Sequence, residues 1–343
     1  TATDPCGNTA TCQSTYVVTN DLSASIDLGG GCGFPGPRLF SSYPEMNGFG
    51  TLAVVNADPA GTIFLFVDPQ PFDVPFFGQQ CLIWVDPFSA LILGPFPVSP
   101  LGDWALTTFV PDAQVLLNFE FMAQVVIFAP SGPLANGAYV TNGVQTKVGT
   151  TAPYCTQSTS GFAGAGPGGT IFDLYYETVF AGGLTIGEYV PGNGSLAPNG
   201  LTWVGDDGGR IALKAFLGDA AAPSGALASD AADPTLATDG GVLAQQTATL
   251  ALNLGFNAAG VLGGNTNFGT NVYLNIGVAD SLSGYTVSLL LTVADQALAG
   301  YPLPSGYTYD SLAALIGEVN ASFDGCVPTT WSNVHVFNPV TPP

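Results

Sequence analysis

Short apolar runs alternate with turn-forming residues up to about residue 149. The runs are rich in β-branched and aromatic side chains, as in Thr62–Asp68, and clusters of Pro, Gly and Asp separate them. Many short strands at this spacing predict a β-sandwich. The predicted strands are Tyr16–Thr19, Thr51–Asn56, Thr62–Asp68, Cys81–Asp86, Trp104–Val110, Val115–Ala129 and Ala138–Lys147.

The hydrophobic period changes after about residue 150. One amphipathic helix is predicted to end at Gly300, and a second to begin at an N-cap, Asp310, and to stop at Gly325. By pattern alone, segment 243–256 fits a strand or a helix, and the stretch 218–241 should be a long loop. The helical periodicity comes from Val287, Leu290, Leu291, Ala294 and Leu298, then from Leu312, Leu315, Ile316, Val319 and Phe323, with Thr170–Phe180 and Asp207–Leu217 as weaker candidates.

These patterns predict a multidomain chain. We expect an N-terminal all-β sandwich, followed by a helix-containing domain of α or α+β class that a disulfide clasps. The expected parts are an N-terminal segment or strand at 1–28, the sandwich at 29–149, the helix-containing domain at 150–327, and a C-terminal strand and tail at 328–343.

The chain has six cysteines at wide spacing. An even number of cysteines without Cys-x-x-Cys pairs favours disulfides formed in an oxidising compartment over a zinc site. We favour the pairs Cys6–Cys12, Cys32–Cys81 and Cys155–Cys326, because each closes a plausible structural unit.

The surface must be polar with few ions, since only 8% of residues are charged. There are 25 acidic and 4 basic residues, for a net charge of −21, and this excludes nucleic-acid binding through clustered Lys and Arg. A weakly charged surface suits dense packing against copies of the same protein. The single histidine also excludes multi-histidine metal and haem sites.

Localisation follows from the absence of targeting features in this sequence. No apolar run has the length of a membrane span. The chain begins with polar residues and shows no secretory h-region, so we expect a mature exported chain whose signal peptide has been removed. Together with the cysteines, this predicts an extracellular or cell-surface location.

Candidate catalytic groups are few. Glu120, flanked by Phe119 and Phe121, would have a raised pKa if it were buried, which makes it the best candidate for a glycosidase acid. The simpler interpretation is an outward residue at a strand end. His335 lies between two valines without a Gly-x-Ser-x-Gly motif in the chain, and a structural role is the simpler interpretation for it. We therefore expect no enzymatic activity.

No cofactor is required by the sequence, but calcium is the ion that it favours. Aspartates on turns offer the oxygen ligands that this cation prefers, although the spacing is not that of an EF-hand. The alternatives are a helix N-cap for Asp207 and a solvated loop for the rest. The candidate ligands are Asp206, Asp207, Asp230, Asp233 and Asp239.

Exposed tyrosines are the candidates for contacts with surface glycans. Tyr301, Tyr307 and Tyr309 could stack on sugars or on a neighbouring subunit. They could equally pack beneath the loop that contains Pro302 and Pro304.

Two β-prone segments lie at the ends of the chain and are candidates for assembly. The first is Ser14–Thr19, and the second is Trp331–Phe337, in which alternate residues would share a face. Each segment either completes its own sheet or adds to the edge of the next subunit. The residues concerned are Tyr16, Val17, Val18, Trp331, Val334, Val336 and Phe337.

Short motifs connect the chain to known modules. The first group is Gly31-Cys32-Gly33, Pro37-Arg38-Leu39, Leu52–Ala57, Gln80-Cys81-Leu82, Ala123-Gln124-Val125 and Thr141-Asn142-Gly143. With these motifs, residues 31–148 resemble a β-rich module of exported proteins of planctomycete-type bacteria. The second group is Tyr154–Gln157, Thr178–Gly187, Leu243–Gln246, Leu252–Phe256 and Val319–Gly325, and with it residues 153–326 resemble another bacterial cell-surface module.

The resemblance implies a Cys32–Cys81 bridge, a helix over 243–256 and a surface-associated structural or adhesive role, with no catalytic residue. We therefore expect a non-enzymatic extracellular subunit that assembles with copies of itself into a surface layer, appendage or filament. The alternative is a secreted carbohydrate-binding or adhesive module with calcium in its loops. A second alternative is a secreted glycoside hydrolase.

Overall fold

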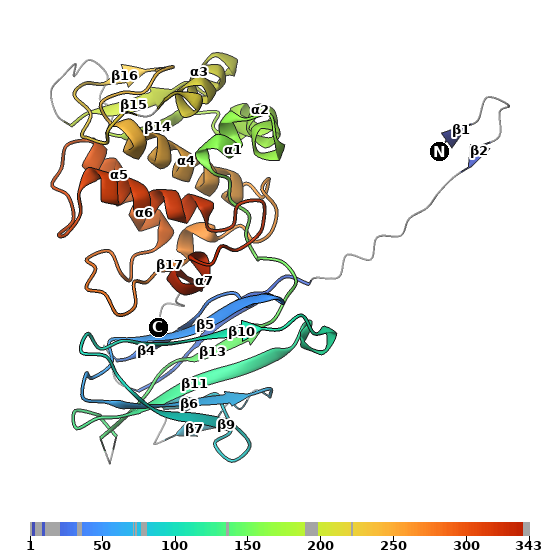
Figure 1. The fold of residues 1–343 in the computed structure, drawn as a ribbon, viewed down its shortest axis with the longest axis vertical. Coiled ribbons are helices and arrows are strands. Elements are labelled where there is room, and N and C mark those ends of the chain that lie inside the picture. Colours follow the sequence, from blue (N-terminus) through green and yellow to red (C-terminus); the bar gives the residue numbers. More distant parts are fainter. Residues whose placement is uncertain are drawn as a thin grey trace.

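The chain folds into a β-rich part and a helix-containing part that lie one above the other along the longest axis (Figure 1). The computed structural model describes residues 21–32, 36–70, 72, 74–76, 81–134, 137–188, 198–220 and 222–338. It also describes two short paired strands, β1 (Ala2–Thr3) and β2 (Thr9–Ala10). The predicted strand Tyr16–Thr19 and the proposed pair Cys6–Cys12 lie outside these residues.

Two antiparallel sheets form the β-rich part and share one hydrophobic core. The core is made by side chains such as Val54 from one sheet and Val125 from the other, both fully buried. The smaller sheet has the order β10–β5–β4, with β4 (Arg38–Ser41), β5 (Gly48–Val55) and β10 (Trp104–Val110). The larger sheet has the order β3–β13–β11–β6–β9, with β3 (Ala24–Gly29), β6 (Thr62–Asp68), β9 (Leu91–Pro97), β11 (Glu120–Phe128) and β13 (Gly143–Lys147), while β12 (Ala138–Val140) also pairs with β11.

The sequence predicted the strands with clean apolar runs, and it missed those with interrupted runs. The predictions for Thr62–Asp68 and Trp104–Val110 are confirmed. Val115–Ala129 is instead divided into a short 3-10 helix, η1 (Gln114–Leu116), and β11. The predicted Cys81–Asp86 is a shorter strand, β8 (Cys81–Ile83), paired with β7 (Val74–Phe76). In the β-rich part, the missed strands are β3, β4, β7 and β9.

The helix-containing part is arranged around α4 (Gly241–Ala258). Residues on every side of α4 are buried, because α6, α5 and β14 pack around it. A helix that is buried on every side has no single apolar stripe, which explains why its sequence also fitted a strand. The other helices are α1 (Thr159–Ala163), α2 (Pro167–Val179), α3 (Asp207–Gly218), α5 (Val287–Leu298), α6 (Tyr309–Ala321) and α7 (Ser332–His335), with a 3-10 turn η2 (Phe268–Thr270).

Short strands complete this part. β14 (Leu184–Gly187), β15 (Gly200–Trp203) and β16 (Ala231–Ala232) form a small mixed sheet. β17 (Val272–Tyr273) pairs with β18 (Val336–Phe337) next to the β-rich part, where α7 also lies (Figure 1). Among the described residues, no helix has both the length and the hydropathy needed to cross a lipid bilayer.

The helix ends differ in detail from the predictions. Helix α5 ends as expected, with Gly300 in the left-handed conformation at a φ of 94°. The N-cap of α6 is Thr308 and not Asp310, because Thr308 forms a capping box with Ser311. The helix ends at Ala321, before Gly325.

The disulfide Cys155–Cys326 is present and joins residues 171 positions apart, so this predicted pair is confirmed. Cys32 is also disulfide-bonded. The side chain of its proposed partner Cys81 lies outside the described residues, so that pairing stays a prediction.

The C-terminal segment differs from the predicted strand. Residues 332–335 form α7, and only Val336 and Phe337 are extended. The predicted face of alternate residues is therefore wrong. Trp331 and His335 are instead one helical turn apart, with ring centroids separated by 4.8 Å. Val336 and Phe337 are both buried within their own chain.

The two parts meet in a shared apolar cluster. Phe40 and Ala53 of the smaller sheet pack against Val272, Leu274 and Phe337 of the helix-containing part. The helix-containing part thereby covers the smaller sheet at Phe40 and Ala53. The division into independent domains stays a prediction.

Candidate functional site

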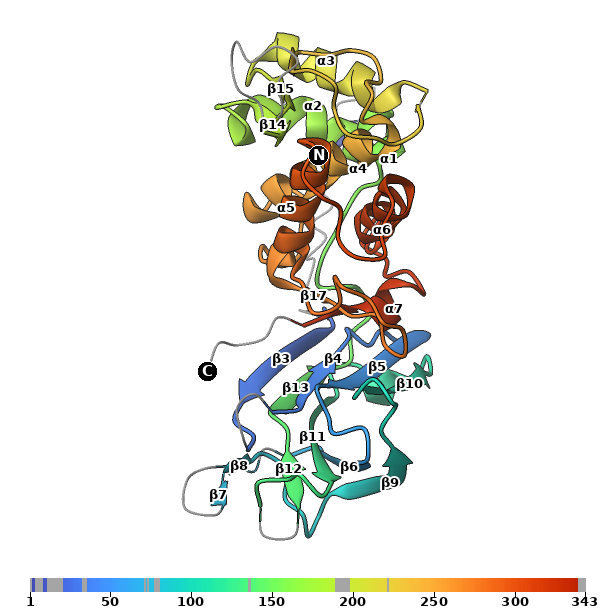
Figure 2. The ribbon, with the colours of Figure 1, turned by 90° about the vertical axis from the view of Figure 1, so that its left-hand side faces the viewer.

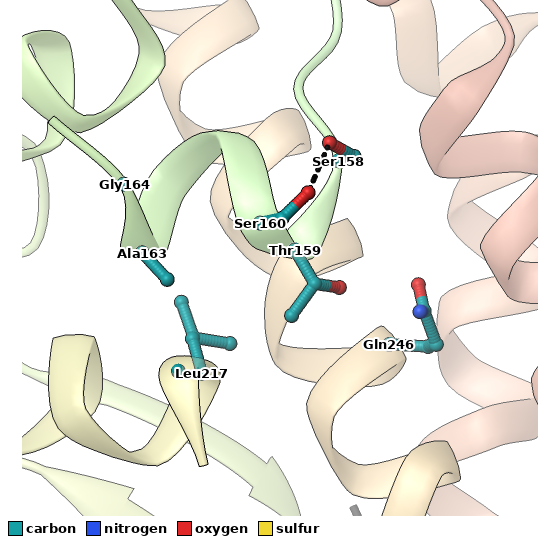
Figure 3. Close-up of a pocket in the computed structure, with 8 residues that line it drawn as sticks. Ser158, Thr159, Ser160, Ala163, Gly164, Leu217 and Gln246 are labelled. Atoms are coloured by element: carbon teal, nitrogen blue, oxygen red, sulfur yellow. Dashed lines mark hydrogen bonds between the residues drawn. The ribbon is translucent and has the colours of Figure 1, made fainter. Parts of the chain in front are cut away.

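A polar pocket of about 520 Å³ lies where α1, α3 and α4 meet (Figure 3). Ser158, Thr159 and Ser160 line one side of it, and Gln246 of α4 lies opposite. Ser158 is the N-cap of α1, accepting a hydrogen bond from Gly161 N, and its Oγ lies 3.3 Å from Ser160 Oγ. The start of α1 thus places hydroxyl groups at the pocket.

A second pocket, of about 500 Å³, lies between α4 and α6 and shares Gln246 with the first. Asp310 and Glu318 supply carboxylates to its lining, and Gly317 of α6 lies next to the side chain of Gln246. Gln246 Oε1 accepts a hydrogen bond from Asn320 Nδ2 at 2.9 Å. We call the two pockets together the α4 groove, since its hydroxyl, amide and carboxylate groups can hydrogen-bond a polar ligand.

A smaller cavity of about 270 Å³ lies where β3 meets the helix-containing part. Tyr43 Oη donates to Asn271 Oδ1 at 2.8 Å, and Tyr154 Oη donates to Asn267 Oδ1 at 2.9 Å. Burial raises the pKa of both tyrosines, so both stay neutral hydroxyls. Ser25 Oγ is buried at this cavity without a hydrogen-bond partner.

The carboxylate of Asp280 organises the loop beside the smaller sheet. It accepts hydrogen bonds from Tyr273 Oη at 2.7 Å, Tyr307 Oη at 2.9 Å and Asn275 Nδ2 at 3.0 Å. Burial opposes ionisation of Asp280, but these hydrogen bonds prevail and lower its pKa. These hydrogen bonds come from residues of the same chain, so Asp280 holds the loop in place. The hydroxyl of Tyr307 takes part in this network.

The other tyrosines that we considered for sugars have separate positions. Tyr301 is exposed and donates to Glu188 Oε2 at 3.0 Å. Tyr309 begins α6 and packs partly against the core. The three tyrosines therefore do not form one stacking platform.

Four of the five aspartates proposed for calcium have partners in local structure. Asp206 is the N-cap of α3, accepting from Gly209 N at 3.0 Å, so the N-cap is not Asp207 as we expected. Asp207 pairs with Arg210. Asp230 accepts from Gly200 N at 2.8 Å and Asp233 from Val204 N at 2.9 Å, while Asp239 lies in the loop before α4. Within the described part of the chain, no three His, Cys, Asp or Glu side chains are grouped as a metal site requires.

The two residues considered for catalysis, Glu120 and His335, contact other residues of the fold. Glu120 is exposed at the start of β11 and accepts from Gln145 Nε2 at 2.9 Å, which agrees with the simpler interpretation of an outward residue at a strand end and not with a buried acid. His335 Nδ1 lies 2.8 Å from Leu274 O, and its ring contacts Trp331 and Tyr273. His335 therefore ties α7 to the strand β17.

Sequence reasoning missed two half-buried carboxyl groups. Burial raises the pKa of Glu45 to about 8, and Glu45 Oε1 has no hydrogen-bond partner. Burial also raises the pKa of Asp295 to about 7, although Gly187 N donates to it at 2.9 Å. Nothing in the local sequence signals either burial, because both depend on contacts between distant segments.

Most of the basic residues are paired with acids. Arg210 and Lys214 both contact Asp173, the latter at 2.6 Å, and Arg38 lies 3.6 Å from Asp27. These ion pairs neutralise much of the positive charge, so the remaining surface is acidic and polar.

Apolar side chains are exposed on the β-rich part. Phe49 and Phe109 form a cross-strand pair between β5 and β10, with ring centroids 5.5 Å apart. Phe128 forms a similar pair with Phe64, at 5.7 Å. Among the described residues, the phenylalanines that are exposed all belong to this part of the chain. They are Phe49, Phe88, Phe109, Phe119 and Phe128.

Comparison with known proteins identifies no family. No family model matches the chain, and no curated protein matches it. The solved structures include the crystal structure of the PmoD soluble domain from Methylocystis sp. ATCC 49242 (Rockwell), which is 13% identical. The match covers 33% of this chain and 90% of that chain at a TM-score of 0.20, too low to support an argument. The resemblance to planctomycete-type surface modules stays a prediction.

Proposed function

We propose that the protein is a non-enzymatic extracellular structural subunit that assembles with copies of itself through its β-rich part. The observation that carries this proposal is the concentration of exposed phenylalanines on that part. Exposed aromatic clusters on a folded protein commonly mark interaction surfaces. Burying one such side chain contributes about 1.5–3 kcal/mol.

Charge supports self-association. With 8% charged residues, two copies can approach with little desolvation of ions, and most basic side chains are already paired within the chain. The net charge of −21 repels copies at low ionic strength. Assembly should therefore strengthen as salt is added.

The disulfides support an extracellular location. Cys155–Cys326 and the bonded Cys32 require an oxidising compartment to form and persist. A low density of Lys and Arg also leaves few cleavage sites for trypsin-like proteases, which suits a long-lived surface protein.

The test is assembly of the full chain, followed by negative-stain microscopy and by light scattering over a range of concentrations. We expect ordered assemblies from the wild-type protein. Assembly should be lost in the double variant Phe49→Ser/Phe109→Ser or in Phe128→Ser. Leu289→Ser, at an exposed site on α5, is the matched control. A wild-type chain that stays monomeric under all conditions contradicts the proposal.

Glycan binding is the second candidate, and the α4 groove favours it because hydroxyl, amide and carboxylate groups converge there. Calorimetric titration with surface polysaccharides tests it. Binding that weakens in Ser160→Ala and persists in Thr185→Ala, a hydroxyl on β14 away from the groove, would support this function.

A further inference from the structure

The four sheet edges of the β-rich part differ in how they are protected. The edge of β4 is covered by the chain itself, because Ser41 N donates to Asn338 Oδ1 and Asn338 N donates to Ser41 O. One edge of the larger sheet is β3, and Ile26 is the only residue of β3 whose side chain is exposed. The remaining edges, β9 and β10, lie on one side of the β-rich part, opposite β3 (Figure 2).

The two remaining edges are chemically unlike. β9 contains Pro95 and Pro97, which cannot donate backbone hydrogen bonds, and its register shifts against β6. Prolines and irregular register are the usual protection of an edge strand. β10 contains neither proline nor charge and pairs with β5 along all of Trp104–Val110 without a shift. Its other edge is therefore suited to receive a further strand.

The core of the sandwich is incomplete beside this edge. Phe96 and Trp104 touch across the gap between β9 and β10, with ring centroids 5.2 Å apart. They are only partly buried, as are Leu93 and Leu106, although all four contact the core cluster. An added strand would cover this apolar rim and remove it from water.

We infer that the edge of β10 receives residues 14–19 of a second copy of the chain. This inference rests on the proposed function of a self-assembling subunit. The run Ser14–Thr19 is β-prone and uncharged, like β10 itself. It precedes the strands that form the core, and the described strands of the two sheets begin at residue 24.

The side chains of the two segments match in pattern. In an extended Ser14–Thr19, Tyr16 and Val18 share one face, and Thr15, Val17 and Thr19 share the other. If Tyr16 and Val18 cover the apolar rim, Thr15 and Thr19 lie on the opposite face of the added strand. That face is on the side of the sheet where the hydroxyls of Thr51 and Thr107 pair, with their oxygens 2.9 Å apart. Backbone hydrogen bonds would supply affinity, and this alternation would set the register.

The geometry of such a contact decides the form of the assembly. The surface that gives the strand and the surface that receives it are different, so the interface is head-to-tail. Head-to-tail contacts that do not close into a ring generate a filament. Each copy would give one strand and receive one.

Hydrogen exchange of the full chain, measured by mass spectrometry in assembled and in dilute samples, tests the inference. Backbone amides in 104–110 should exchange at least about tenfold more slowly in the assembly, while 24–29 should be unchanged. Val17→Pro and Val18→Pro are made separately. Neighbouring strand residues direct their N–H groups to opposite sides, so one of the two removes a bond to β10 and should abolish assembly and protection. Val18→Ile is the matched control and should retain both.

The outcomes separate this inference from the proposed function. If the chain assembles and exchange in 104–110 is unchanged, the inference is overturned and the proposed function stands. Protection of 104–110 that is independent of concentration would mean that the segment binds its own chain, which also overturns the inference. If no assembly forms, both fail.

Discussion

Ser41 and Asn338 hold the end of the described chain on the smaller sheet by two reciprocal hydrogen bonds. Ser41 N donates to Asn338 Oδ1 at 2.9 Å, and Asn338 N donates to Ser41 O at 3.1 Å. Both residues are buried, and they are 297 positions apart. The C-terminal segment therefore protects a sheet edge of its own chain.

Asn338→Ala should destabilise the protein. The substitution leaves Ser41 N buried without an acceptor, at a cost of about 1–3 kcal/mol. Urea unfolding measures the loss. Asn338→Asp keeps an acceptor oxygen and should lose less, whereas equal losses in the two variants would contradict a role for this hydrogen bond.

Removal of the Cys155–Cys326 disulfide should lower the free energy of unfolding by about 2–5 kcal/mol, because the bond closes a very long loop in the unfolded chain. The double variant Cys155→Ser/Cys326→Ser avoids a free thiol, and thermal unfolding without reductant measures the effect. An unchanged melting temperature in this variant would show that the clasp does not stabilise the fold.

The stability of the protein should depend on pH through Glu45. Its pKa in the folded state is about 8, above the ordinary value of 4.5, so the folded protein binds the proton more tightly than the unfolded chain. Glu45 therefore supports folding fully below about pH 4.5, and this support is lost as the pH rises to about 8. The loss should be about 1–2 kcal/mol, since the group is only partly shielded from water.

Glu45→Gln isolates this effect, because the amide has a similar shape and does not titrate. Urea midpoints of the variant and the wild type are compared at pH 5 and pH 9. The variant should be the more stable protein at pH 9 and should show a weaker dependence on pH. Parallel pH profiles in the two proteins would rule out Glu45 as the source.

The start of α6 can be tested by two neighbouring substitutions. Thr308→Ala should cost about 1 kcal/mol, because it removes the capping box with Ser311. Asp310→Ala should cost less, since Asp310 only accepts a long hydrogen bond of 3.3 Å from Ser224 N and lies in the first turn. Chemical denaturation measures the free energy of unfolding of both variants. A larger loss in Asp310→Ala than in Thr308→Ala would show that Asp310 is the cap.

Local pattern was enough for strands whose apolar runs are bounded by turn residues. Trp104–Val110 was predicted with its observed bounds because its apolar run ends at turn residues on both sides. β9 was missed because Gly94, Pro95 and Pro97 interrupt its run, and only pairing with β6 makes it a strand.

The candidate site depended still more on tertiary structure. The hydroxyls of Ser158 and Thr159 and the amide of Gln246 are nearly 90 positions apart in sequence, and only the packing of α1 on α4 brings them together. The phenylalanine neighbours of Glu120 left both a buried acid and an outward residue open, and the structure shows that Glu120 is exposed. In a strand, neighbouring side chains point to opposite faces, so apolar neighbours do not imply burial.

By itself, the sequence determined the scarcity of charge and predicted the change from β-rich to helical structure, while it only favoured the pairing of Cys155 with Cys326 among several possible pairings. The first two follow from composition and periodicity, which are summed or local properties of the chain. Tertiary structure alone decided that residues 332–335 are helical while Val336 pairs with Tyr273, and that β10, among the described strands, is paired on one side only. Backbone hydrogen bonds to a strand, and the burial of one sheet edge rather than another, depend on partners distant in sequence, which no local pattern specifies.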